Sequence, residues 1–223
     1  MKPLLAALLL ALPIVAASAA AAQRDEVVSA APNASWRSVA TGDDRGRLRR
    51  WRDAWMEALA QVRAGDNAAE IVRGGVLFEP DAALADPAPP AGDYSCRTIK
   101  LGTPRRDLLD YVAYPAFRCR IALVGRRLHF TKLTGSQRPV GILFPDNGRR
   151  MVFLGTLMLS DETRALRYGR DRERDLVGIV ERLAPDRWRI AFPFPHHESL
   201  LDVIELTPVA RRGAGAGFTE TTR

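Results

Sequence analysis

The chain of 223 residues has few of the side chains that most often carry chemistry. It contains two cysteines, three histidines and three lysines, and 30 of its 33 basic residues are arginines. It also has no Cys-x-x-C, no phosphate-binding glycine loop and no Gly-x-Ser-x-Gly elbow. The sequence therefore gives no support for thioredoxin-like redox chemistry, P-loop nucleotide binding or an α/β-hydrolase site.

Long apolar runs are also missing, except at the N-terminus. Lys2 precedes an apolar stretch that is too short for a membrane span with ordinary flanks, and small residues follow, with cleavage sites near Ala19 and Ala22. These features are typical of a cleaved secretory signal peptide, the alternative being an uncleaved anchor. We expect a signal peptide over residues 1–22, no transmembrane segment in the mature chain, and a periplasmic or secreted protein.

The scarce cysteines and histidines favour a disulfide over a metal site. Cys96 and Cys119 form an isolated pair, which in an exported protein is more often a disulfide than a metal or redox site. His196 and His197 are adjacent, so on a strand they would point to opposite faces and would be poorly placed to bind one ion. We predict a Cys96–Cys119 disulfide, no metal and no cofactor.

The charge is basic but mixed along the chain. The formal net charge is +7, and arginines alternate with acids in segments such as "GRDRERD". Interleaved signs do not form the basic stripe that nucleic-acid binding requires. We expect no nucleic-acid partner, while an anionic partner such as an outer-membrane phosphate or an acidic polymer stays open.

The first part of the mature chain has a helical pattern. Apolar residues recur every three or four positions after Asp43 or Asp44, either of which can cap a helix, and Gly65 ends the pattern. These residues are Leu48, Trp51, Trp55, Leu59 and Val62. A second short helix is expected within "NAAEIVRGG", before a connection rich in Pro and Ala.

The second part of the chain has the pattern of short strands. Eight apolar or alternating runs are separated by Gly, Pro, Asn or Asp, and short separators favour antiparallel hairpins. The runs begin at Tyr94, Ala116, Arg127, Pro139, Arg150, Asp175, Arg187 and Leu201. We predict a mainly β (α+β) fold, in which the N-terminal helical segment packs on a small, lipocalin-like, eight-stranded antiparallel barrel. A β-sandwich is the alternative.

These patterns divide the chain into consecutive parts. We expect a signal peptide over 1–22, a flexible leader over 23–42, a helical segment and connection over 43–91, a barrel domain over 92–210 and a disordered tail over 211–223.

Several blocks of the sequence resemble a known family. They include "GDYSCRTIKLG", "YPAFRCRI", "KLTGSQRPVGILFPD", "DRERDLVGIVERL" and "LDVIELTP", in this order. Between about Trp51 and Pro208 the chain resembles the DUF4893 family, which consists of exported, mostly alphaproteobacterial proteins of unknown function. The resemblance implies an exported, compact protein and implies no activity, cofactor or catalytic residue.

Alternation along the strands predicts which side chains face the barrel interior. In the first two strands the residues that share a face with the cysteines are largely apolar, which makes this face the interior. This face carries Tyr94, Cys96, Thr98, Lys100, Phe117 and Cys119. In the third strand Lys132 shares the corresponding face with Phe130. Both lysines of the mature chain are therefore expected inside, near strand ends.

The segment "LHFTKLTGSQR", residues 128–138, is the most plausible place for a site. A lysine at the barrel mouth can bind an anionic ligand or a buried carboxylate, although a lysine at a strand end often only extends to water. Thr134 and Ser136 are expected to bond the backbone of a turn. The candidate ligand-binding residues are Lys100, Lys132, Ser136, Gln137, Arg138 and Tyr94.

Two functions follow from these expectations. The first is non-catalytic binding of a small or lipidic ligand or of an envelope protein, with Tyr94, Phe117, Phe130 and Trp188 lining the barrel. The alternative is a hydrolase or inhibitor-like module around Lys100, Lys132, Ser136 and Arg138, which would need Ser136 to pair with a lysine. No catalytic residue is assigned.

Overall fold

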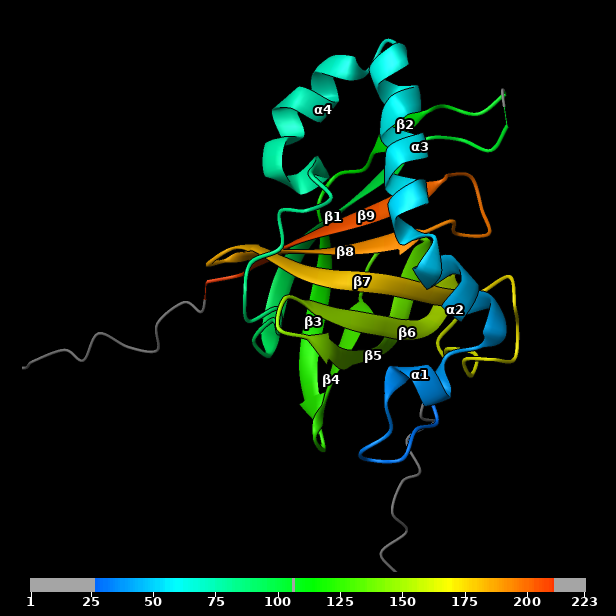
Figure 1. The fold of residues 1–223 in the computed structure, drawn as a ribbon. Coiled ribbons are helices and arrows are strands. Elements are labelled where there is room, and N and C mark those ends of the chain that lie inside the picture. The colour runs from blue at the N-terminus through cyan, green and yellow to red at the C-terminus, as the bar shows by residue number, and fades with distance from the viewer. Residues whose placement is uncertain (1–26, 106, 211–223) are drawn as a thin grey trace, which may run out of the picture.

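The structure is a computed structural model that describes residues 27–105 and 107–210 (Figure 1). The signal peptide expected over 1–22 and the tail expected over 211–223 lie outside the described residues. Within the described ranges, no helix is both long enough and apolar enough to cross a membrane.

The strands form a closed antiparallel barrel, which confirms the predicted fold class. In the sheet each strand from β3 to β9 pairs with the next, and β1 pairs with both β3 and β9, so that eight strands close the barrel. The strands are β1 (Gly92–Leu101), β2 (Tyr111–Ala113), β3 (Phe117–Val124), β4 (Arg127–Lys132), β5 (Gln137–Asn147), β6 (Arg150–Leu159), β7 (Asp175–Ala184), β8 (Arg187–Pro193) and β9 (Leu201–Pro208). The short β2 adds a ninth strand beside the end of β1 and was not predicted.

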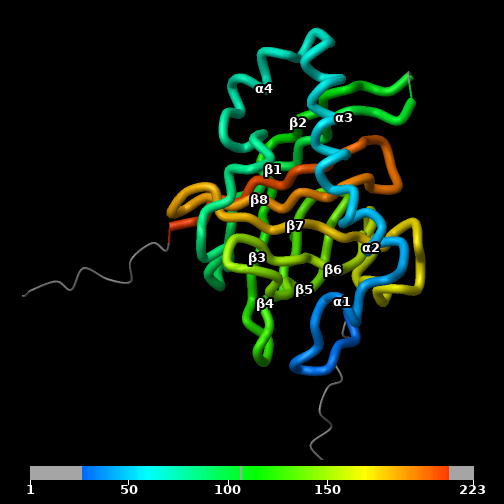
Figure 2. The backbone as a smooth tube through the Cα atoms, in the orientation of Figure 1, coloured from blue at the N-terminus to red at the C-terminus, as the bar shows by residue number. Residues whose placement is uncertain are grey.

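The helices lie on the outside of the barrel (Figures 1 and 2). They are α1 (Trp36–Val39), α2 (Gly42–Arg49), α3 (Trp51–Ala64), α4 (Ala68–Gly74) and the 3₁₀ helix η1 (Gly75–Phe78). The single helix expected between Asp43 and Gly65 is instead two helices that meet at Arg50. Thr41, rather than Asp43 or Asp44, caps α2, and its hydroxyl accepts a hydrogen bond from the Asp44 amide.

The helical layer explains why some strands are apolar on both faces. The inner face of β7 packs in the barrel, while its outer face, including Val177 and Ile179, packs beneath α2. A strand that is covered on both sides becomes a nearly continuous apolar run, as in "DLVGIV". In the part of the chain that the structure describes, no helix covers β3, whose Arg118 and Arg120 are exposed, so its sequence alternates.

Residues 27–42 are more ordered than the flexible leader expected over 23–42. Val28 is fully buried, and Trp36 donates a hydrogen bond of 2.8 Å from Nε1 to Asp146. The apolar outer faces of β5 and β6 account for this difference, because they offer a surface for this segment to cover.

A disulfide crosslinks two strands of the barrel, and packed side chains fill one end of its interior. The Cys96–Cys119 disulfide joins β1 to β3 and confirms the predicted bridge. Tyr94 and Trp188 pack edge to face with ring centroids 6.3 Å apart, and both are almost fully buried with Phe130. The aromatic residues expected to surround a ligand thus form the core itself, except for Phe117, which is only partly buried.

A buried ion pair fixes the η1 segment to the barrel. Arg189 is fully buried on the outer face of β8, and its guanidinium donates two hydrogen bonds to Glu181 at 2.6 and 2.8 Å. It also donates to the Leu77 carbonyl at 2.8 Å and lies over the ring of Trp55. One side chain therefore connects two strands, η1 and α3.

We expect Arg189→Met to lower the free energy of unfolding by roughly 3–5 kcal/mol, because it leaves the Glu181 carboxylate buried with less compensation. Arg187 lies two residues away on the same strand and forms the more exposed pair with Glu205. Arg187→Met should therefore cost no more than about 1 kcal/mol. Urea unfolding of both variants tests this, and equal losses would contradict the role of Arg189.

Candidate functional site

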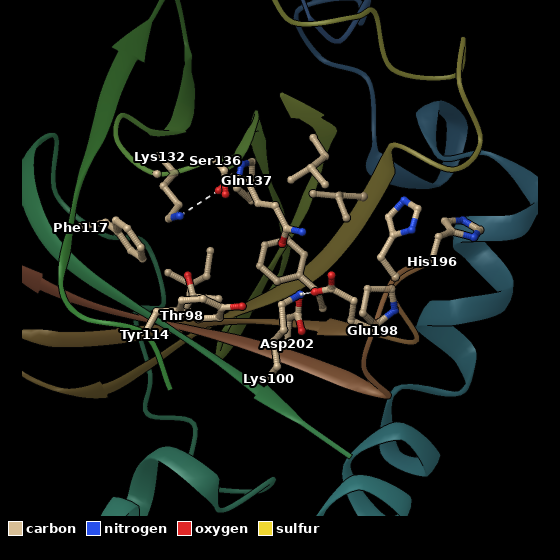
Figure 3. A pocket seen from close by; sticks show the side chains of 18 of the residues that line it. Thr98, Lys100, Tyr114, Phe117, Lys132, Ser136, Gln137, His196, Glu198 and Asp202 are labelled. Atoms are coloured by element: carbon tan, nitrogen blue, oxygen red, sulfur yellow. Dashed lines mark hydrogen bonds and ion pairs between the residues drawn. The ribbon is translucent and has the colours of Figure 1, made fainter. Parts of the chain in front are cut away.

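A pocket of about 340 Å³ opens at one end of the barrel (Figure 3). Its walls are the inner faces of β1 and of the strands from β3 to β9. The turn between β4 and β5, the loop between β6 and β7 and the loop between β8 and β9 complete its rim. The apolar part of the lining comprises Phe117, Pro139, Leu157, Leu176, Phe192 and Ile204. Polar side chains surround it, namely Thr98, Lys100, Lys132, Ser136, Gln137, Glu173, His196, His197, Glu198 and Asp202. The pocket thus combines an apolar surface with a charged rim.

Closure of the barrel brings Lys100 beside Asp202. These residues are directly opposite each other in the β1–β9 pairing, and both face inward. Lys100 Nζ lies 3.2 Å from an Asp202 carboxylate oxygen and 3.3 Å from a Glu198 carboxylate oxygen. The Ser199 hydroxyl donates a hydrogen bond of 2.5 Å to the other oxygen of Asp202. The positive charge of Lys100 is therefore balanced by two carboxylates, and all these groups belong to one hydrogen-bonded network.

Contact between Lys100 and the carboxylates shifts the pKa values of these groups. Burial lowers the pKa of Lys100, but the charges of Asp202 and Glu198 outweigh burial, so its pKa is raised above the ordinary value. Burial raises the pKa of Asp202, against the effect of Lys100. At neutral pH the lysine is protonated and carries the positive charge that holds this side of the rim together.

Lys132 has a different environment from Lys100. Its side chain is only 4% exposed, and its ammonium group donates a hydrogen bond of 2.8 Å to the Gln137 carbonyl. The same nitrogen lies 3.7 Å from the centre of the Phe117 ring. It forms no ion pair with a carboxylate of the described residues. Burial, together with the charges of Arg138 and Lys100, lowers its pKa to about 8.

The turn after β4 holds Lys132 in place. Gly135 adopts a positive φ of 92°, and a Cβ at this position would lie 2.9 Å from both Lys132 Nζ and the Phe117 ring. Glycine is therefore favoured at this position for two reasons: it adopts the positive φ without strain, and it leaves room for the Lys132 ammonium beside the turn. The Thr134 hydroxyl accepts a hydrogen bond from the Arg118 amide of β3, so it contacts a neighbouring strand rather than the backbone of its own turn as predicted.

The pocket brings together four of the six candidate residues. Lys100, Lys132, Ser136 and Gln137 line it. Arg138 has the opposite strand parity and binds the carbonyls of Gly135, Ser160 and Glu162 instead. Tyr94 does not line the pocket, and its hydroxyl donates to the Pro90 carbonyl.

Within the described residues, neither Lys100 nor Lys132 is a hydrogen-bond partner of Ser136. The Ser136 side chain is exposed. The Lys132 ammonium is directed at a carbonyl and a ring. The hydrolase hypothesis, which needs a Ser–Lys contact, stays a prediction.

The carboxylates of the rim were not among the predicted site residues. Asp202 shares its strand face with Ile204 and Leu206, and an acid on an apolar face is the signal that identifies it. Glu198 belongs to a loop, so strand alternation does not place it. His196 is also on this loop, and its Nε2 lies 3.5 Å from Asp43 of α2, so the helical layer contacts the rim.

Among residues 27–105 and 107–210, no group of three or more His, Cys, Asp or Glu side chains is arranged to hold a metal ion. The two adjacent histidines both line the pocket. Burial, followed by the charge of Arg47, lowers the pKa of His196, so this imidazole is neutral at pH 7.

The two lysines should differ in their effect on stability. Lys100→Met leaves the Asp202 carboxylate without its counter-charge and should lower the free energy of unfolding by roughly 2–3 kcal/mol, less than for a fully buried pair. Lys132→Met removes a desolvated charge that has no carboxylate partner, so its cost should stay within about 1 kcal/mol. Urea unfolding at pH 7 compares the two, and a larger loss for Lys132→Met would contradict this assignment.

Comparisons with known proteins agree with the resemblance seen in the sequence. No curated protein and no solved structure was found to match the chain. One family matches, the domain of unknown function DUF4893, over residues 36–206. This range includes the helices and nearly all of the barrel, from α1 to Leu206 in β9. The chain therefore belongs to the DUF4893 family.

Proposed function

We propose that this is an exported, non-catalytic binding protein that holds one small, partly apolar molecule in the pocket at the barrel mouth. The observation that carries this proposal is the division of the interior into a filled part and an open part. Tyr94, Phe130 and Trp188 pack closely together, whereas Leu157 and Leu176 line open space. Protein interiors are normally packed to the density of organic crystals, so an open apolar space of this size is unusual.

The size and lining of the pocket support a small ligand. Its volume of about 340 Å³ is near the lower end of the range of roughly 300–1,000 Å³ that is typical of small-molecule sites. An apolar lining supplies affinity, while a few polar groups orient the ligand. A ligand that fills the whole barrel is not supported, because the aromatic residues at the other end occupy that space.

The disulfide supports export. Structural disulfides persist in oxidising compartments and are rare in the cytosol of mesophiles. Cys96 and Cys119 are both buried and join two barrel strands, so the bridge belongs to the folded core. Together with the apolar, small-residue N-terminal segment, this supports a periplasmic or secreted location.

Binding can be measured with N-phenyl-1-naphthylamine, a neutral apolar dye whose fluorescence rises in apolar surroundings. We expect one dye per protein and an affinity that falls roughly tenfold or more in Leu176→Trp, because the larger side chain fills the pocket. Leu123→Trp is the matched control, since Leu123 is exposed and lies outside the pocket. Native mass spectrometry of protein purified from its own envelope should also show a bound small molecule.

Equal dye affinity in wild type and Leu176→Trp would contradict the pocket as the binding site. If, in addition, native mass spectrometry showed an associated protein and no small molecule, an envelope-protein partner would replace the small ligand.

A further inference from the structure

We infer that the pocket selects amphipathic molecules with an anionic head group, which Lys132 binds while the apolar part lies against the apolar residues of the opposite wall. This inference rests on the proposed function and adds the chemical class of the ligand. It is based on the different partners of the two inward-facing lysines, on an unsatisfied hydroxyl in the pocket wall and on the position of the apolar residues.

Of the two lysines that line the pocket, Lys132 is the one without a carboxylate partner among the described residues. Lys100 already contacts Asp202 and Glu198. Glu173 is exposed at the rim, where water screens its charge. An ammonium group has three donors, and the structure gives Lys132 one carbonyl acceptor and one aromatic ring. An anionic oxygen in the pocket would supply both the missing charge and a further acceptor.

A second polar group in the pocket also lacks a partner. The Thr98 hydroxyl is buried and has no hydrogen-bond partner in the part of the chain that the structure describes. Thr98 lines the same pocket as Lys132 (Figure 3). Unsatisfied buried hydroxyl groups are uncommon and costly in folded proteins. The Thr98 hydroxyl is therefore a second candidate donor for an acceptor oxygen of a ligand.

Nearby positive charge favours the same ligand class. Arg138 lies outside the pocket and is hydrogen-bonded to carbonyl oxygens, and its charge acts at the Lys132 ammonium. A cation that destabilises a second cation stabilises an anion placed beside it. The Phe117 ring and the turn around Gly135 shield Lys132 from water, which strengthens such an interaction.

The arrangement of the lining sets the orientation of the ligand. Lys132 is at the end of β4, beneath the turn that forms the rim. Leu176, Phe192 and Ile204 are on the strands of the opposite wall. An acidic group near the rim would place an attached hydrocarbon against these residues. The pocket is too small and too polar at its rim for a bulky lipid with two chains.

Probes that differ only in the head group test this inference. We expect octanoate to bind wild-type protein at least about tenfold more tightly than octan-1-ol in calorimetry at pH 7, because a charge-assisted hydrogen bond is stronger than a neutral one. Octyl phosphate is a third probe. Tighter binding of the phosphate identifies a phosphoryl head group, tighter binding of the carboxylate identifies a carboxylic acid, and either result supports an anionic ligand.

Two variants attribute the preference to Lys132. Lys132→Met should lower the octanoate affinity to that of octan-1-ol, while the octan-1-ol affinity changes less than about twofold. Arg126→Gln removes the same unit of charge from the exposed β3–β4 turn and should bind both probes like wild type. Retention of the octanoate preference in Lys132→Met would overturn the inference.

The pH dependence gives an independent test. Below its pKa of about 8, Lys132 is protonated in the free protein, and an anion stabilises this form further. Octanoate affinity should therefore fall less than about twofold between pH 7 and 8 and more steeply above about pH 8, until it approaches the octan-1-ol affinity, which itself stays constant. The other charged or titratable groups in or near this region are Lys100, Tyr114, Arg138, Glu173, His196, His197, Glu198 and Asp202.

The outcomes separate this inference from the proposed function. If octan-1-ol binds in a manner that Leu176→Trp abolishes, and octanoate and octyl phosphate bind no more tightly, the anionic class is wrong and the proposed function stands. If neither the alcohol nor the anions bind, and no small molecule accompanies the purified protein, both proposals fail.

Discussion

The pairing of β1 with β9 is the constraint on which the rest of the structure depends. It runs over eight residue pairs, from Tyr94 opposite Pro208 to Leu101 opposite Leu201, and it converts an open sheet into a barrel. Closure satisfies both edges of the sheet and creates an interior. It also places Lys100 opposite Asp202, so the ion pair at the rim is a direct consequence of the register.

The two inward-facing lysines show how the same residue type acquires different properties in one pocket. Lys100 is compensated by two carboxylates, and the ion pairs stabilise its charge. Lys132 is desolvated and is held by a carbonyl and an aromatic ring, which are weaker partners for a cation than a carboxylate. A buried charge with such weak partners destabilises the folded protein in the absence of a ligand. This cost is the physical basis for assigning the ligand contact to Lys132 rather than to Lys100.

The sequence predicts the faces of the strands better than positions along the barrel axis. Alternation correctly places Cys96, Lys100 and Lys132 inside, because side chains alternate strictly along a strand. Tyr94 shares this face but lies at the filled end of the barrel. Alternation along a strand predicts which face a side chain is on, but not how far along the barrel axis it lies. Arg138 was proposed from its closeness in sequence to Lys132, although its parity directs it outward. Glu198 and His196 reach the rim through a loop whose path depends on tertiary contacts.

The helical layer and the pocket belong to one structural unit. Asp43 of α2 forms an ion pair with Arg172 and lies 3.5 Å from Nε2 of His196. Arg172 and His196 belong to the two loops that contribute Glu173 and Glu198 to the rim. Beneath the same helix, the Arg47 side chain is hydrogen-bonded to Asp44 and to the Asp175 carbonyl at the start of β7. Removal of the helices would therefore release the rim loops as well as expose the outer apolar face of the barrel. This coupling gives a physical reason why the family match begins at α1 and extends into β9, with no boundary between the helices and the barrel.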